Sequence, residues 1–501
     1  DNITGDKQKD SNLIGQFGVG FYSVFMVADR VQVLSKSAYE SSNEAILWES
    51  SGEEKYKLEQ STKESNGTDI IIYLNEDNHE FAEEGRVKFL LEKYSQYINF
   101  PLNLISESGE VNRINDSEAL WLKPKRSIKD EEYNDFYKFT TFDQEDPLFW
   151  VHNKVEGKSE YTNLLYVPSK PPFDLWNRES PRGVKLYIQR VFIMDDASHF
   201  LPLYLRFVRG IIDTSDLPLN VSREILQEHH LVDTIKKGVT KKILDSLVAL
   251  KKDSFDKYKN FWKEYGLVLK EGTAEDFENK ELIASLLLFS STYSEKDSPE
   301  NTLDDYIARM TEDDNKIYYC VADTYQAAAN SPHIEGLKSK GKEVLLLTDR
   351  IDEWLMTGLI EYKGKELVNA AKEEITEAEQ KKVSESDQDL VSKIKKHLDS
   401  KVSEVIVSSR LTDSASCLVV PKNEPGAQLR RILEASGQTM EASNPIFEIN
   451  SKHKLLKKLK DLKGKQFNSF VDFLYDYAVI AEGGSPQDPS KYLRQLDKYL
   501  S

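Results

Sequence analysis

The chain has 501 residues, of which 39% are hydrophobic and 10% aromatic, so it is long enough for about three domains with cores of their own. Its net charge of −18 argues against binding to nucleic acid or to an anionic membrane, because both require basic surfaces. The two cysteines, Cys320 and Cys417, fit neither a disulfide framework nor a metal site. We therefore expect buried, reduced thiols, no metal ligands in this sequence and a cytoplasmic location.

Residues 1–115 are expected to form an α/β unit. A glycine-rich turn over residues 15–21 precedes a helix, since Phe21, Val24, Phe25 and Ala28 recur at helical spacing. A strand is expected at residues 31–34. A second strand at residues 70–74 is apolar on both faces, which predicts a central position in its sheet.

Residues 116–385 are expected to form a second α/β domain. Residues 184–189 alternate as a strand, and residues 344–347 are predicted to be a buried parallel strand. A long helix is expected to start near Ser222, which is a suitable N-cap. The charged residues 363–395 indicate a solvated helical or loose connector.

Residues 386–501 are expected to form a third, α+β domain. Strands are predicted at residues 405–407 and 417–420, followed by three helices. The last two helices, at 467–481 and 491–500, carry apolar stripes on Phe470, Val471, Leu474, Tyr477 and Ala478 and on Leu493, Leu496 and Leu500.

The glycine turn is a candidate phosphate-binding site. Three glycines give the backbone conformations closed to other residues, so that amides can converge on phosphate oxygens at the positive end of the following helix. The alternative is a tight turn that is merely rich in glycine. The turn is no Walker loop, and it resembles the glycine motif of the gyrase, histidine kinase and MutL ATPase superfamily. Its residues are Gly15, Gln16, Phe17, Gly18, Val19, Gly20 and Phe21.

A second candidate lies in residues 217–227. With a nucleotide domain upstream, Arg223 is suited to neutralise charge at a γ-phosphate, and Gln227 lies one helical turn later on the same face. Taken alone, Arg223 is more simply an ordinary solvated arginine in the first turn of a helix.

Several phrases taken together resemble one family, the heat-shock protein 90 chaperones in their bacterial HtpG type. The resemblance runs in order along the whole chain. The bacterial type is favoured because there is no long charged linker near residue 115 and no acidic Met-Glu-Glu-Val-Asp tail. The matching phrases are residues 11–23, 153–157, 164–169, 191–196 and 220–227.

The resemblance implies three domains and an ATPase activity with ATP and Mg²⁺. Residues 1–115 correspond to the C-terminal part of a Bergerat-type (GHKL) ATP-binding sandwich, residues 116–385 to the α/β middle domain, and residues 386–501 to the dimerisation domain. Amides of residues 15–21 hold the phosphates, and Thr68 helps to bind adenine, largely through water. Arg223 reaches the γ-phosphate beside Gln227.

The resemblance also implies partners. These are partly folded client proteins and a second copy of the chain, bound through the last two helices. Trp354 matches a client-binding tryptophan, although an ordinary core tryptophan is the alternative. The helix at residues 428–433 matches a client-facing helix, with Leu429, Ile432 and Leu433 as contacts.

One departure affects the ATPase. The family's catalytic glutamate, magnesium-holding asparagine and adenine-binding aspartate lie upstream of the glycine turn, and none of them is found in this sequence. We therefore expect the chain to be a fragment of a longer protein, with the magnesium ligand in a segment upstream of Asp1.

The expected function follows from that departure. We expect an ATP-dependent chaperone in the complete protein, with this chain inactive in hydrolysis by itself. The first alternative is a nucleotide-independent scaffold that holds clients. A DNA-mismatch or topoisomerase ATPase is a more distant alternative, against which the acidic charge counts.

Overall fold

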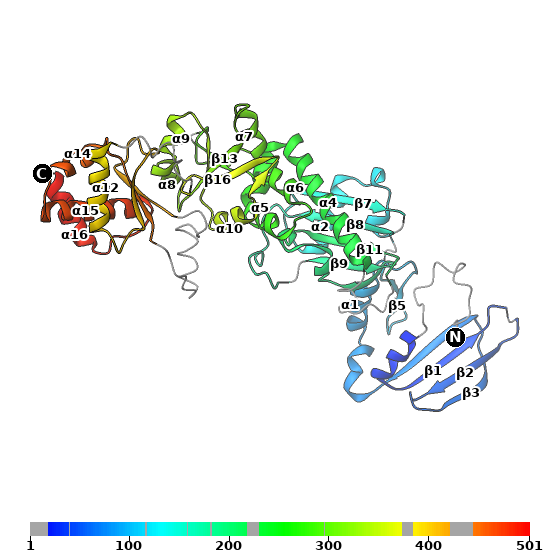
Figure 1. Ribbon diagram of the computed structural model, residues 1–501. Coiled ribbons are helices and arrows are strands. Elements are labelled where there is room, and N and C mark those ends of the chain that lie inside the picture. The colour runs from blue at the N-terminus through cyan, green and yellow to red at the C-terminus, as the bar shows by residue number, and fades with distance from the viewer. Residues whose placement is uncertain are drawn as a thin grey trace. The chain divides into compact units, whose positions relative to one another are not determined.

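The computed structural model describes residues 19–39, 41–115, 118–157, 159–180, 183–217, 230–294, 296–372, 384–420 and 444–500 (Figure 1). The chain divides into two compact units: unit 1 is Asp1–Pro202 with Arg206–Ile243, and unit 2 is Leu203–Leu205 with Leu244–Ser501. Each unit mixes helices with sheets, so the expected multidomain α/β class is confirmed at this level. The domain boundaries at residues 115 and 385 stay predictions.

Unit 1 begins with an antiparallel sheet in the order β3-β2-β1-β4 (Figure 1). The expected strand at residues 31–34 is confirmed within β1. The helix before it is a 3₁₀-helix, η1, and Ala28 already belongs to the strand. The elements are η1 (Val19–Met26), β1 (Ala28–Lys36), β2 (Glu44–Ser50), β3 (Tyr56–Thr62) and β4 (Gly67–Leu74).

The expectation of a central strand at residues 70–74 is wrong. Among the described strands β4 ends the sheet order, and Ile70, Ile71 and Ile72 are 51%, 44% and 43% exposed. A run of β-branched residues favours any extended strand, whether it is central or at an edge. The pattern therefore predicted the strand correctly but not its place.

The rest of unit 1 contains a second sheet, and side chains of this sheet belong to an aromatic core. Tyr97, which follows α1 (Glu84–Ser95), contacts Trp121 with ring centroids 4.7 Å apart, and both rings pack near Tyr187. The sheet order is β10-β9-β11-β8-β7, with only β9 and β11 parallel. Its strands are β7 (Phe149–Val155), β8 (Tyr161–Val167), β9 (Val184–Ile188), β10 (Val191–Met194) and β11 (Arg209–Thr214).

Unit 1 also contains the helix α2 and a small two-stranded sheet. The helix α2 (Asp130–Thr141) covers the aromatic core with Tyr133 and Tyr137, and β5 (Asn103–Ile105) pairs with β6 (Val111–Arg113). The predicted strand at residues 184–189 is confirmed up to Ile188, after which Gln189 and Arg190 turn the chain with φ angles of 50° and 67°. The long helix α4 (His230–Asp253) continues the chain, and its expected start near Ser222 lies outside the described residues.

Unit 2 contains a five-stranded sheet in the order β12-β14-β13-β16-β15. The strand predicted at residues 344–347 is confirmed, since β14 is fully buried and parallel to β13. The connector predicted over residues 363–395 is wrong at its start, because Lys365–Asn369 pairs in parallel with β13. The strands are β12 (Ser290–Ser291), β13 (Lys316–Val321), β14 (Val344–Leu347), β15 (Glu361–Tyr362) and β16 (Lys365–Asn369).

Helices accompany this sheet along the chain. The longest, α5, buries ten residues, among them Phe261, Tyr265 and Leu269. The others are short, with five to seven residues each. They are α5 (Phe255–Glu275), α6 (Lys280–Leu286), α7 (Leu303–Arg309), α8 (Tyr325–Ala329), α9 (Glu335–Ser339) and α10 (Asp352–Gly358).

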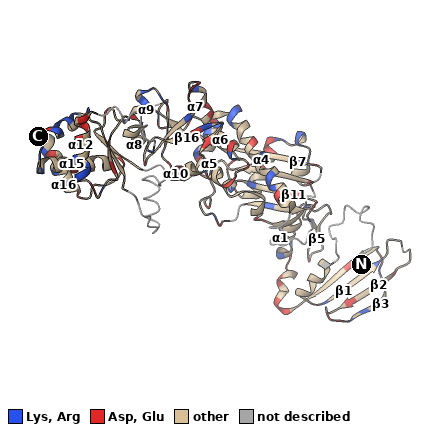
Figure 2. Ribbon diagram, in the orientation of Figure 1, with Lys and Arg blue, Asp and Glu red and all other residues tan. Residues whose placement is uncertain are grey.

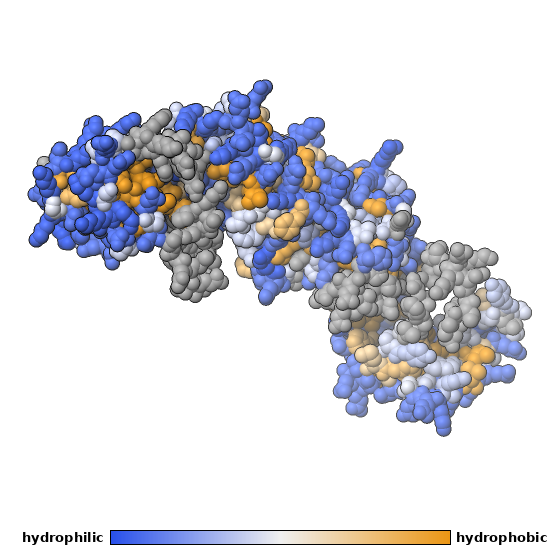
Figure 3. All heavy atoms as spheres, viewed as in Figure 1, coloured by the Kyte–Doolittle hydropathy of each residue, from blue (hydrophilic) through white to orange (hydrophobic). Residues whose placement is uncertain are grey.

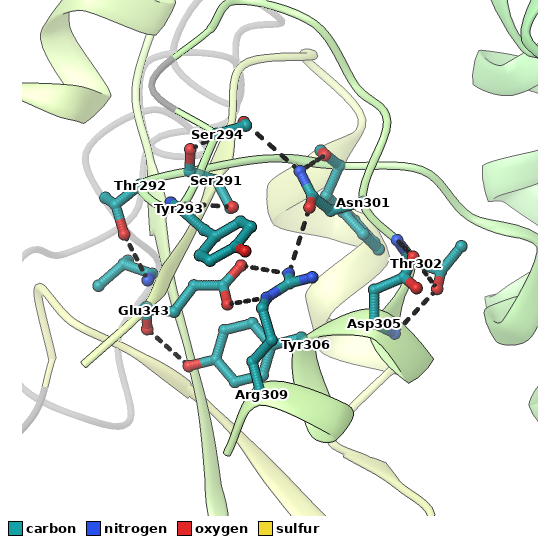
Figure 4. A network of polar contacts seen from close by, with 12 residues as sticks. Ser291, Thr292, Tyr293, Ser294, Asn301, Thr302, Asp305, Tyr306, Arg309 and Glu343 are labelled. Atoms are coloured by element: carbon teal, nitrogen blue, oxygen red, sulfur yellow. Dashed lines mark hydrogen bonds and ion pairs between the residues drawn. The ribbon is translucent and has the colours of Figure 1, made fainter. Parts of the chain in front are cut away.

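A polar network fixes α7 against the sheet (Figure 4). Arg309 forms a bidentate ion pair with Glu343, at 2.8 Å from Nε and 2.7 Å from Nη2, and its Nη2 also donates to Asn301 at 3.2 Å. The guanidinium lies 4.3 Å from the centre of the Tyr293 ring. Planar bidentate pairing is among the strongest kinds of side-chain hydrogen bonding, so this network is a structural support.

The C-terminal part of unit 2 has a three-stranded sheet, β17-β19-β18, packed with helices. The predicted strands and the three following helices are confirmed. The elements are α12 (Glu385–His397), β17 (Glu404–Val407), β18 (Ser416–Val419), β19 (Ile446–Ile449), α14 (Lys454–Asp461), α15 (Lys465–Ala481) and α16 (Pro489–Leu500).

The apolar stripes of the last two helices are only partly as predicted. On α15, Phe470, Val471, Leu474 and Ala478 are buried as expected. On α16, Leu493 is 58% exposed, whereas Leu496 packs against the core as predicted, together with Tyr492 and Tyr499. Two tyrosines thus contribute to the packed face, which the sequence assigned to leucines alone.

A buried ion pair joins α5 to the segment after β14. The Lys270 Nζ donates at 2.6 Å to Asp352 and at 2.6 Å to Asp349. The side chains of Lys270 and Asp352 are 4% and 1% exposed. Burial alone would lower the pKa of Lys270, but the two carboxylates raise it, so the lysine stays charged.

Removing one partner of this pair should destabilise the fold strongly. We expect Lys270→Met to lower the free energy of unfolding by about 3–5 kcal/mol, because it leaves the Asp352 carboxylate buried without a counter-ion. Urea unfolding followed by circular dichroism measures the change. The exposed pair of Lys393 with Asp389 is a matched control, and Lys393→Ala should cost no more than about 0.5 kcal/mol. Equal losses in the two variants would contradict the assignment.

Candidate functional site

The glycine turn is described only at its C-terminal end. Gly15, Gln16, Phe17 and Gly18 lie outside the described residues, whereas Val19, Gly20 and Phe21 begin η1. The Gly20 carbonyl accepts a hydrogen bond of 2.7 Å from the Ser23 hydroxyl. Apart from Gly20 and its neighbours in the chain, no atom of the described residues lies within 4 Å of the position that a Cβ atom on Gly20 would take.

The magnesium ligand was expected upstream of Asp1, and this expectation stays a prediction. Asp1 lies outside the described residues, which begin at Val19, so the structure neither places nor tests a metal-binding group at that end of the chain. The candidate phosphate-binding turn is therefore described only at its C-terminal end.

Strand register brings Thr68 onto the same face of the first sheet as Phe21. Thr68 lies opposite Ser35 on β1, and their hydroxyls are 2.8 Å apart. Val33, two residues before Ser35 and therefore on the same face, lies opposite Trp48. The Phe21 ring packs edge-on against Trp48, with centroids 5.8 Å apart. Residues far apart in sequence thus share one surface.

That shared face is apolar and largely open. Ile46, Tyr56 and Leu58 are 49%, 65% and 61% exposed, and register places all three on the face of Trp48. Figure 3 shows hydrophobic surface on the part of the molecule that holds this sheet. The Thr68 and Ser35 hydroxyls are hydrogen-bonding groups at one end of it. A ligand with a flat apolar body and polar edges fits such a surface.

Hydrogen bonds to the buried Asp213 side chain hold β11, the strand that precedes Arg223 in the chain. Arg223 and Gln227 lie outside the described residues, which stop at Leu217. Just before, Asp213 on β11 accepts hydrogen bonds from the Trp121 indole at 2.8 Å and from the Arg190 amide at 3.3 Å. Burial raises the pKa of the Asp213 carboxyl above its ordinary value. Sequence reasoning missed this contact, because Trp121 and Asp213 meet only through the tertiary fold.

A cavity of about 220 Å³ lies beside β11 in unit 1. Several of its residues belong to the phrase 153–157 and to the turn after β9. Its charges are mixed, so the cavity has no single-sign preference for a ligand. It is lined by Leu122, Lys154, Val155, Glu156, Glu160, Tyr161, Thr162, Gln189, Arg190, Asp213, Thr214 and Ser215.

The client-contact candidates are divided between described and undescribed residues. Trp354 lies on α10 and is 38% exposed, while its neighbours Leu355 and Met356 are buried. A tryptophan that is more than one-third exposed is available for contacts, and the Lys270–Asp352 pair fixes its helix. Leu429, Ile432 and Leu433 lie outside the described residues.

Both cysteines are buried free thiols, as expected. Burial raises the pKa of Cys320 to about 12 and that of Cys417 well above its ordinary value. Within the described ranges, no three His, Cys, Asp or Glu side chains are grouped so that they could hold a metal ion. Nor is any helix of those ranges long and apolar enough to cross a bilayer.

Comparison with known proteins completes the assignment of the class. The family model described as Hsp90 protein matches residues 106–501. The chaperone protein HtpG of Shewanella sp. strain MR-7 is 46% identical over 525 aligned residues, which cover 100% of this chain and 82% of that protein. The HtpG chaperone of Shewanella oneidensis gives the same identity and coverage. These similarities define a molecular chaperone.

The chain belongs to the Hsp90 family, and within it to the bacterial HtpG type. The resemblance seen in the sequence is therefore confirmed. The family match does not test the individual site residues. Thr68 and Phe21 share one face of a sheet, whereas the roles of Arg223, Gln227 and Trp354 stay predictions.

Proposed function

We propose that this protein is an ATP-dependent chaperone that acts as a cytoplasmic homodimer and clamps partly folded client proteins. Besides the family membership, one observation carries the proposal. Phe21, at the end of the glycine turn, and Thr68 lie on the same open apolar face of the first sheet. That sheet corresponds, in the proposal, to the C-terminal part of a Bergerat-type ATP-binding domain.

The proposed nucleotide site combines backbone and hydroxyl donors. Amides of residues 15–21 would hold the phosphates, with Phe21 anchored on Trp48 to close the turn. The Thr68 and Ser35 hydroxyls fit the polar edge of adenine, directly or through water. The proposal assigns the adenine end of ATP to the described residues, among which no three His, Cys, Asp or Glu side chains are grouped to hold Mg²⁺. We expect the magnesium ligand upstream of Asp1.

The proposed role of Arg223 is to neutralise charge on the γ-phosphate. A guanidinium keeps its charge at any physiological pH and donates in a fixed planar geometry, which suits phosphate oxygens. The hydrogen bonds that Asp213 accepts hold β11, the strand that precedes Arg223 in the chain. Hydrolysis would then depend on bringing Arg223 to the nucleotide, which couples the reaction to a change in domain geometry.

The proposed ATP site can be tested by measuring ATP turnover. We expect the 501-residue chain alone to show no ATP turnover. A chimera that also carries the part of the Shewanella oneidensis relative outside the aligned region should hydrolyse ATP, and Arg223→Ala should reduce its rate by about 10³-fold or more. Phosphate release measures both rates.

The exposed Lys57→Ala change in β3 is the control for the chimera and should leave the rate unchanged. Turnover by the chain alone that disappears with Arg223→Ala would contradict the proposal. If the chimera holds clients but never responds to ATP, the alternative of a nucleotide-independent scaffold is correct.

Client binding is proposed to involve Trp354. Its exposed indole gives a large, rigid contact area at low entropic cost, the property of residues that dominate binding surfaces. Leu429, Ile432 and Leu433 are proposed to extend this contact. Partly folded proteins expose apolar segments that such a surface can hold.

Truncating Trp354 should weaken client binding. We expect Trp354→Ala to raise the dissociation constant for a fluorescently labelled, permanently unfolded protein by about tenfold, measured by anisotropy. Phe255, which is 37% exposed on the same unit, is the matched control, and Phe255→Ala should change the constant less than about twofold. An equal loss in both variants would show a nonspecific effect of surface hydrophobicity.

Dimerisation is proposed to use the outer faces of α15 and α16. Ile480 on α15 and Leu493 on α16 are 42% and 58% exposed. Other apolar residues of α15, such as Phe470 and Leu474, are buried. Exposed apolar side chains on neighbouring helices favour burial against a second copy.

A charge on this face should dissociate the dimer. We expect Leu493→Glu to weaken self-association by about tenfold or more, because a carboxylate would be buried at an apolar contact. Sedimentation equilibrium at micromolar concentration measures the shift. Val111→Glu introduces the same charge at a residue that is 61% exposed in unit 1, and it should leave the dimer intact. A wild-type chain that sediments as a monomer would refute this part of the proposal.

A further inference from the structure

One cavity of the described residues belongs to none of the sites above. It has a volume of about 630 Å³ and lies in the C-terminal part of unit 2, between α12, the end of α14 and the start of α15. This volume is in the range of small-molecule sites, which is about 300–1,000 Å³. It is lined by Ser386, Asp389, Leu390, Lys393, Lys396, His397, Lys460, Leu462, Lys463, Gly464, Phe467 and Asn468.

The lining is strongly basic in an acidic protein. Four lysines and one histidine line the cavity, against a single carboxylate, that of Asp389. The chain as a whole has a net charge of −18, yet residues 454–465 contain six lysines and only one acidic residue, Asp461. Figure 2 shows Lys and Arg segments on the helices of this region. A local concentration of like charge raises the local concentration of anions.

Three of the five basic side chains already have partners. Lys393 donates to Asp389 at 2.5 Å, Lys460 to Asp387 at 2.7 Å, and His397 contacts Asp472 at 2.9 Å. These pairs hold the walls in place and neutralise part of the charge.

Lys396 and Lys463 differ from the other three. Neither side chain has a hydrogen bond or an ion pair with any residue that the structure describes, and both residues are exposed. They lie on different elements, one near the end of α12 and one between α14 and α15. Two lysines without a described partner therefore line the same cavity from two different elements.

The start of α15 adds to this positive potential. Gly464 is its N-cap, with φ 55°, and it provides no side chain to accept from the first amides of the helix. The first turn of α15 also contains no acidic residue. Free amides at a helix N-terminus carry partial positive charge, so an anion near Lys463 gains a further attraction.

The floor of the cavity is apolar. Leu390 is 4% exposed and belongs to the core, and Leu462 and Phe467 are partly buried against that core. A purely polar ion would leave this floor in contact with water. An occupant with an apolar body as well as an anionic head would bury it, which is favourable by about 25 cal/mol per Å² of apolar area.

We propose that this cavity binds a small amphiphilic anion, in which a carboxylate or phosphate head is attached to an aliphatic or aromatic body. The head lies between Lys396 and Lys463 near the start of α15, and the body covers Leu390, Leu462 and Phe467. The site is separate from the proposed ATP site and from Trp354.

Isothermal titration calorimetry on the full chain tests this proposal with two probes, decanoate and monodecyl phosphate, each below its micelle concentration. Both heads satisfy the same chemistry, and the tighter probe identifies the preferred one. The double variant Lys396→Glu/Lys463→Glu should weaken binding by about tenfold or more, because it reverses both unpaired charges. Raising the salt concentration should weaken binding of the wild type as well.

The matched control is Lys457→Glu/Lys458→Glu, which makes the same charge change on exposed positions of α14 outside the cavity. It should keep the affinity within about threefold. Neutral decanol should bind much more weakly than either anion. Circular dichroism checks that both double variants keep the wild-type fold. We expect no loss of structure from the first, because neither Lys396 nor Lys463 has a hydrogen bond or an ion pair with a described residue.

Three results would overturn the proposal. The first is that both double variants lose binding equally, which would indicate a general charge effect. The second is that decanol binds as tightly as decanoate, which would indicate an apolar pocket without an anion site. The third is that neither amphiphile binds while an oligoglutamate peptide does, which would make the cavity a peptide-docking surface.

Discussion

The buried ion pair between Lys270 and Asp352 constrains how unit 2 is packed. A charge that is almost fully buried is tolerated only when its partner is held at hydrogen-bonding distance, so the pair fixes α5 relative to the segment after β14. Because α10 begins at Asp352, the same pair also sets the position of Trp354. Stability and the proposed client surface therefore share one electrostatic support.

Much of the fold could be predicted because its signals are local. The strand at β9 alternates, β14 is a short continuous apolar run, and α15 carries its buried side chains at helical spacing. The failures concern what surrounds an element. The isoleucines of β4 predict a strand but not an edge, and Lys365–Asn369 is polar enough to resemble a connector although it pairs inside a sheet. On α16 two tyrosines pack beside Leu496, where leucines alone were expected.

The candidate site, too, could be predicted only in part from the sequence. The glycine turn and Arg223 are visible in the sequence as short phrases, since their chemistry depends on residue types at fixed spacing. The neighbourhood of Thr68 and Phe21 is not visible, because it arises from the pairing of β1 with both β2 and β4. Likewise, Lys270 is far in sequence from its partner Asp349, and Lys396 is far from Lys463, which lines the same cavity. Only tertiary structure shows which charges remain uncompensated.

The burial of the two thiols has a consequence for oxidative chemistry. The thiolate is the form that reacts with peroxides, and at neutral pH the raised pKa values of Cys320 and Cys417 leave almost none of it. Sulfenic acid formation and mixed disulfides are thereby suppressed in unit 2. Among described sulfur atoms, oxidation should fall first on Met26, which is 79% exposed, whereas Met356 is buried. Since methionine sulfoxide is enzymatically reversible, oxidative damage to the described part of the chain would begin at a repairable position.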